Sequence, residues 1–95
     1  MKNRTKELEA LQNELCHCSA EITKRTSFPS NVAVKVSYKI NEILLLTDRE
    51  NKKEVIDEEI TSLIEYITGF RIPYNDKEYI EQSLYKCNRL LTAVR

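Results

Sequence analysis

The chain has few residues that make tight turns, since its 95 residues include one glycine and two prolines. Because glycine and proline punctuate a chain, their scarcity favours a few long elements, which means helices. Loops that cradle phosphate groups need several glycines, and Gly69 stands alone. The sequence therefore favours a helical fold and argues against a phosphate-binding loop.

Ligands for metal ions are equally scarce, since His17 is the only histidine and there are three cysteines. Cys16, His17 and Cys18 are consecutive, but neighbouring residues on a helix point about 100° apart. Paired zinc ligands are instead separated by about two to four residues, and Cys87 has no neighbouring partner in the sequence. An odd number of cysteines also fits reduced thiols better than a disulfide framework. We therefore expect no metal site and no cofactor.

Residue patterns that support catalysis are missing as well. The side chains of Cys16 and His17 leave a helix in different directions, so they do not form a nucleophile and its base. The carboxylates of VIDEEITSLIEYI, residues 55–67, lack the Glu-x-x-His spacing that binds metals in helical bundles. We therefore expect no catalytic residues and a non-enzymatic protein.

Neither sign of charge is in excess, because 15 Lys and Arg residues balance 15 Asp and Glu residues. A domain that binds nucleic acid usually carries a basic excess, so nucleic acid is a disfavoured partner. No apolar run approaches the about 20 residues of a membrane span. Residues 1–15 contain acidic side chains and lack the apolar centre of a secretion signal. We therefore expect a cytoplasmic protein with no membrane span.

Three segments repeat apolar residues at steps of three and four, the spacing of one face of a helix. They predict helices over residues 4–25, 52–68 and 76–94. Asn51 and Asn75 are each followed by glutamate three residues later, so they predict N-terminal caps for the last two helices. The apolar stripes consist of Leu8, Leu11, Leu15, Cys18 and Ile22; Ile56, Ile60, Leu63, Ile64 and Ile67; and Ile80, Leu84, Cys87, Leu91 and Val94.

The stretch NVAVKVSYKI, residues 31–40, fits two secondary structures. Its valines alternate with other residues as in a half-buried strand, but no other segment alternates in this way to pair with it. A helix over residues 31–47, capped by Ser30 or Asn31, is therefore the favoured interpretation. On that helix one face carries Ala33, Val36, Ile40, Ile43, Leu44 and Thr47.

The segment TDRENKK, residues 47–53, separates the second and third predicted helices without glycine or proline. As a short connection it gives an antiparallel bundle of four helices. If it is helical instead, residues 31–68 form one long helix and the bundle has three. Because connections in helical bundles are short, we predict an all-α, antiparallel four-helix bundle that forms a single domain over residues 1–95.

Val34, Tyr38 and Leu45 lie on the second predicted helix, away from its first apolar face. A helix that is apolar on more than one face is normally enclosed. The second helix is therefore either the central element of the bundle or a surface for self-association. In the second case, these three residues form the contact between the two copies of a homodimer.

The loop GFRIPYND, residues 69–76, is a second candidate surface, and its glycine stands where helices commonly end. Phe70, Arg71 and Tyr74 belong to residue types that are enriched at binding hot spots. They predict a site for a partner protein. The alternative is that Phe70 and Tyr74 fold back over the end of the bundle and close its core.

Charge is unevenly placed, because residues 54–65 include five acidic and no basic side chains. Asp57 and Glu58 in this segment predict a surface for a cationic partner, unless basic helices on either side neutralise it. The basic side chains that are candidates for contact with nucleic acid are Lys24, Arg25, Lys35 and Lys39.

The sequence leaves three functions open. The favoured one is a regulator, adaptor or inhibitor that acts by binding another protein, as a homodimer if the second helix self-associates. The alternatives are a toxin-neutralising protein of the immunity type and a regulator that binds nucleic acid.

Overall fold

A computed structural model describes residues 6–49 and 51–94, and this part of the chain forms four helices. Their bounds are Lys6–Lys24 (α1), Ser30–Leu46 (α2), Lys53–Thr68 (α3) and Tyr74–Ala93 (α4). The four predicted helices are confirmed to within about two residues. Residues 4 and 5, where the first was predicted to begin, lie outside the described residues.

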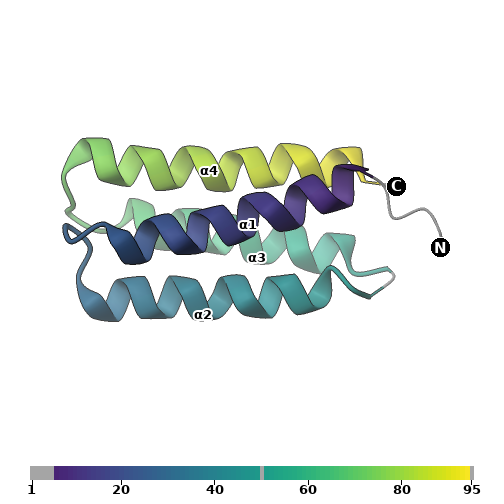
Figure 1. Ribbon diagram of the computed structural model, residues 1–95, viewed down its shortest axis with the longest axis horizontal. Helices are drawn as coiled ribbons and strands as arrows, with labels where there is room; N and C mark the ends of the chain where they lie inside the picture. Colours follow the sequence, from purple (N-terminus) through teal and green to yellow (C-terminus); the bar gives the residue numbers. More distant parts are fainter. Residues whose placement is uncertain (1–5, 50, 95) are drawn as a thin grey trace.

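The helices run antiparallel to their neighbours in an elongated bundle of 41 × 19 × 19 Å (Figure 1). α1 packs against α2 and α4, and α3 packs against the same two helices. The prediction of a four-helix bundle is therefore confirmed, and the alternative with one long helix is wrong. Since α2 packs against α1 and α3 alone, the interpretation of α2 as a central, enclosed helix is also wrong.

Residues 31–40, which the sequence alone left between strand and helix, lie within α2. Val32, Val36, Ile40 and Ile43 are fully buried, as the helical spacing predicts. Val34 lies on the opposite side and is 64% exposed. Two valines that a strand would place on one face therefore lie on opposite faces of a helix.

A single apolar core runs along the bundle. The four predicted stripes point into it, and of their members only Leu44 and Val94 are partly exposed. Thr47 at the end of α2 is buried, where its hydroxyl donates to the Leu44 carbonyl at 2.6 Å and accepts from the Gln12 amide at 2.8 Å. This polar pairing at the end of the core satisfies a hydroxyl that water does not reach.

The predicted side-chain caps are wrong, because α2 and α4 begin directly after prolines. Pro29 and Pro73 occupy the N-cap positions without a side-chain hydrogen bond. Their rings hold φ near −56° and −48°, values that suit the start of a helix. Consequently Ser30, Asn31 and Asn75 lie inside the helices instead of capping them.

Asn51 also does not cap α3, since Lys52 holds that position. Asn51 instead adopts a positive φ of 62°, a left-handed conformation that asparagine tolerates better than most residues. Gly69 stands at the C-cap of α3 as expected, but its φ of −75° is one that any residue can adopt. Asparagine, and not glycine, therefore supplies the unusual backbone geometry in the described part of this chain.

Two matched substitutions test the orientation of α2. We expect Val32→Ala to lower the free energy of unfolding by about 1.5–3 kcal/mol, because it removes buried methyl groups and leaves a cavity. Val34→Ala should change it by less than about 0.5 kcal/mol. Urea unfolding followed by circular dichroism measures both. Similar losses in the two variants would contradict the helix, because a strand buries both valines or neither.

Candidate interaction surface

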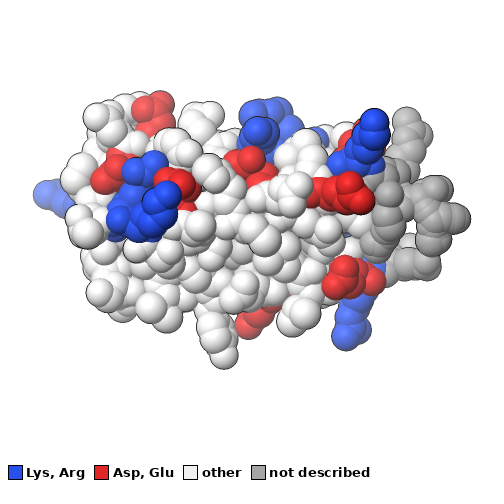
Figure 2. Space-filling view, viewed as in Figure 1, with Lys and Arg blue, Asp and Glu red and all other residues white. Residues whose placement is uncertain are grey.

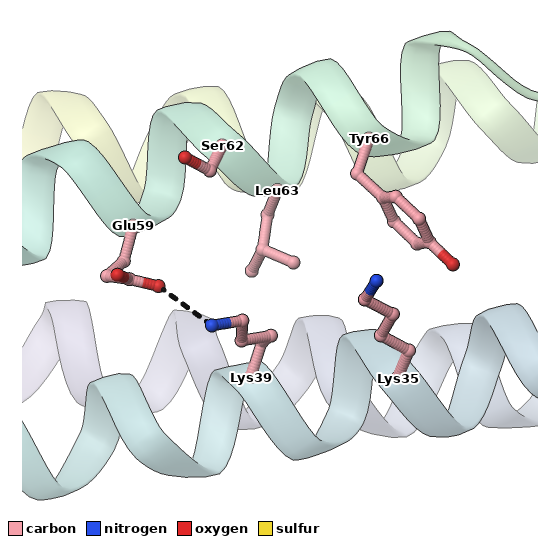
Figure 3. A pocket seen from close by; sticks show the side chains of 6 residues that line it. All are labelled: Lys35, Lys39, Glu59, Ser62, Leu63 and Tyr66. Carbon is pink, nitrogen blue, oxygen red and sulfur yellow. Dashed lines mark hydrogen bonds and ion pairs between the residues drawn. The ribbon is translucent and has the colours of Figure 1, made fainter.

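A shallow groove lies between α2 and α3 and encloses about 270 Å³. Figure 3 shows that side chains from both helices point into it. Lys39 faces Glu59, Lys35 faces Tyr66, and Leu63 lies between these two pairs (Figure 3). The groove is lined by Lys35, Lys39, Glu59, Ser62, Leu63 and Tyr66.

Lys39 joins the two helices across this groove. Its Nζ lies 3.4 Å from the Glu59 carboxylate on α3 and 3.6 Å from the Glu42 carboxylate on its own helix. The hydrogen bond that Lys39 donates to Glu59 and the negative charges of Glu59 and Glu42 raise the pKa of Lys39. Glu42 is exposed and Lys39 and Glu59 are partly exposed, so water screens this network and it fixes the register of α2 on α3 more than it stabilises the fold.

At the other end of the groove, Lys35 and Tyr66 point towards one another (Figure 3). The Lys35 ammonium lies 4.6 Å from the centroid of the Tyr66 ring, within the range of a cation–π interaction. Tyr66 also contacts Phe70 edge to face: their ring centroids are 4.9 Å apart and their planes meet at 76°. Phe70 is thereby linked to the groove.

The outward face of α2 carries a row of large apolar side chains. Val34, Tyr38 and Leu45 are 64%, 70% and 68% exposed, and Asn41 completes the row between the last two. We call these four residues the outer row of α2. Figure 2 shows charged side chains of both signs over the upper part and towards the ends of the visible face, whereas much of the surface over α2 is uncharged. The three predicted self-association residues therefore share one exposed surface.

The loop after α3 separates the residues that the sequence grouped together. Phe70 is half-buried against the core, and its carbonyl accepts a hydrogen bond of 2.8 Å from Lys77. Arg71 is exposed, and Tyr74 is 72% exposed at the start of α4. The alternative in which Phe70 closes the core fits its position. For Tyr74 the same alternative is wrong, because the helix start after Pro73 directs its side chain outward.

The acidic residues of α3 differ in whether they form an ion pair. Glu59 pairs with Lys39, but Asp57 and Glu58 are exposed and have no ion pair with any described residue. Neutralisation of α3 by basic neighbouring helices is thus limited to one contact in the described part of the bundle. Asp57 and Glu58 remain available to a cationic partner.

The basic candidates do not form a patch. Lys24 and Arg25 both lie 3.2 Å from the Glu21 carboxylate, and Arg25 also contacts Asp76 of α4 at 3.4 Å. The ion pairs and hydrogen bonds to Glu21 lower the pKa of this carboxyl group, the Lys24 hydrogen bond most of all. With Lys39 paired as well, three of the four predicted basic residues are already matched by carboxylates.

The three cysteines and the histidine differ in exposure and in their contacts. Cys16 is exposed, while Cys18 and Cys87 are buried in the core. Burial raises the pKa of Cys18 to about 12 and also raises the pKa of Cys87, which keeps both thiols protonated. His17 Nε2 lies 2.9 Å from the Tyr79 hydroxyl of α4. Among residues 6–49 and 51–94, no three His, Cys, Asp or Glu side chains are close enough to hold a metal ion.

Asn41, Glu42 and Lys35 were not assigned to the candidate surface by sequence reasoning. Asn41 is polar, so the apolar pattern does not include it, although its spacing from Tyr38 and Leu45 places it in the row. The signal for Glu42 was its three-residue spacing from Lys39. The contact of Lys35 with Tyr66 had no sequence signal, because it depends on how α2 lies against α3.

In the described part of the chain, none of the helices combines the length and apolar character needed to cross a membrane. Comparison of the chain with models of protein families, with curated proteins and with solved structures gave no match.

Thiol reactivity tests the placement of the cysteines. At pH 8 we expect Ellman's reagent to modify one thiol per folded chain rapidly, because Cys16 is exposed and the other two are buried and protonated. Cys18 and Cys87 should react only after the protein is unfolded in guanidinium chloride. Cys16→Ser serves as the control and should remove the rapid phase. Rapid reaction of two or more thiols in the folded wild type would contradict this placement.

Proposed function

We propose that the protein is a non-enzymatic regulator, adaptor or inhibitor that acts by binding another protein through the outer row of α2. The observation that carries the proposal is the exposure of Val34, Tyr38 and Leu45, each at least 64%, on one face of one helix. Water contact with three large apolar side chains is unfavourable, and burial against a partner removes it. Tyrosine is also enriched among residues that dominate binding energy.

The groove beside this row supports the same function. It adds charged and aromatic groups to an apolar surface, as in the polar rim of a protein interface. At about 270 Å³ it is below the usual size of a pocket for a small molecule. The surface as a whole therefore suits a macromolecular partner. The buried, reduced thiols further support a cytoplasmic location, where disulfides are rare.

A second candidate function is the neutralisation of a cationic protein such as a toxin. Asp57 and Glu58 favour it, because they are exposed and have no basic partner in the described residues. Arg71 and Tyr74 are exposed as well, but they lie at the other end of α3. Binding of nucleic acid has less support, since Lys24, Arg25 and Lys39 are paired with carboxylates.

Capture of partners with a charged variant tests the first proposal. We expect Leu45→Glu to abolish capture of every protein that the wild type retains specifically from a lysate of the source cells, because it places a charge at the apolar contact. The matched control is Tyr85→Glu on α4, whose side chain is 45% exposed outside the outer row. Mass spectrometry identifies the retained proteins. Equal retention by Leu45→Glu and Tyr85→Glu would refute the assignment of the surface.

A charge reversal tests the second candidate. We expect a fluorescent oligolysine peptide to bind the wild type more weakly as salt is raised, because exposed charges are screened. The double substitution Asp57→Lys and Glu58→Lys should abolish this binding, whereas Glu9→Lys on α1 should preserve it. Fluorescence anisotropy measures the affinity. Binding that is insensitive to salt or to the reversal would exclude an acidic site on α3.

A further inference from the structure

We propose that the partner seated on the outer row of α2 is a second copy of this chain, with the two α2 helices packed antiparallel about a twofold axis. This inference rests on the proposed function and names its partner. Three features of the outer face of α2 support it: the spacing of the row, the position of its polar residue and the charges along one edge.

The spacing of the outer row is symmetric. Val34, Tyr38, Asn41 and Leu45 follow one another at steps of four, three and four residues, so the row reads the same in both directions. A twofold axis between residues 39 and 40 places Val34 against the partner's Leu45 and Tyr38 against the partner's Asn41. Every large apolar side chain of the row then meets a side chain of the other copy, which is the requirement of an isologous contact.

These steps are also those of the seam of a coiled coil, in which positions alternate at three and four residues. The seam has one polar member, Asn41, which lies next to the axis and faces a tyrosine in the proposed dimer. A single asparagine in such a seam lowers stability but selects register and orientation. A register that placed Asn41 opposite Val34 or Leu45 would remove water from its amide without supplying a polar partner.

Charges along the edge of the row distinguish the two orientations of the helix pair. Lys35 and Glu42 are seven residues apart, so they lie on the same edge, the one towards α3. Antiparallel packing about a twofold axis brings this edge of one copy against the same edge of the other. Lys35 then faces the partner's Glu42, and the pair occurs twice. In parallel packing the edge would instead face the uncharged Ser37 and Leu44 edge.

Lys35 and Glu42 are both exposed, and each makes one contact within its own chain that leaves room for the pair. Lys35 has no ion pair with any described carboxylate and lies over the Tyr66 ring. Glu42 shares Lys39 with Glu59 and is 55% exposed. A contact confined to one helix pair buries less than the roughly 1,600 Å² of a standard interface, so we expect a dimer that depends on concentration in the micromolar range.

Two charge reversals test the proposed pairing by sedimentation equilibrium. Lys35→Glu and Glu42→Lys each replace both attractive pairs with repulsive ones, and each should weaken the dimer on the order of tenfold. An equimolar mixture of the two variants should form a heterodimer about as tight as the wild-type dimer, because every pair is again attractive. Glu65→Lys on the exposed face of α3 makes the same charge change as Glu42→Lys and should leave dimerisation unchanged.

The outcomes separate this inference from the function on which it rests. A wild type that stays monomeric up to about 1 mM, or reversals that the mixture does not rescue, would overturn the antiparallel dimer. If the dimer is overturned but Leu45→Glu still abolishes capture of a different protein, the outer row remains a binding surface, and its partner is that other protein. If the wild type dimerises and the mixture restores the dimer, both the surface and its partner are supported.

Discussion

The architecture depends on the burial of one apolar stripe from each of four helices in a common core. α1 and α3 each pack against α2 and α4, so every helix has two neighbours and one side that faces water. Of the described helices, α1 exposes no large apolar side chain, α3 exposes Val55 and α4 exposes three tyrosines. Only α2 exposes a row that includes two aliphatic side chains, Val34 and Leu45, beside Tyr38. A bundle with a single core cannot cover a second stripe, and the functional proposal follows from this geometric limit.

Polar contacts between neighbouring helices fix how far each helix is shifted along the next. The Ser83 hydroxyl donates to Glu14 at 2.6 Å between α4 and α1, and Arg25, directly after α1, lies 4.2 Å from the centroid of the Tyr79 ring of α4. Lys39 and Glu59 serve the same role between α2 and α3. The Arg25 and Lys39 contacts are partly exposed and contribute little energy, whereas Ser83 is buried; together the three contacts penalise a shift of one helix along its neighbour by a turn.

The helices and their buried faces could be predicted from the sequence, because three- and four-residue spacing follows directly from helix geometry. Helix starts were less predictable, since asparagine and proline both favour them and Pro73 took the position expected of Asn75. The outer row was visible in sequence as surplus apolar residues. The groove was not, because Lys35 and Tyr66 are 31 positions apart and meet only when α2 lies against α3.

The pairing of α1 with α4 has a consequence for synthesis on the ribosome. α1 is translated first of the four helices and α4 last, yet Leu11, Leu15 and Cys18 lie in the core to which α4 contributes. Their apolar side chains therefore stay partly uncovered until residues 74–93 have left the exit tunnel. The nascent chain thus has a period in which a chaperone, or another emerging copy, competes with its own last helix.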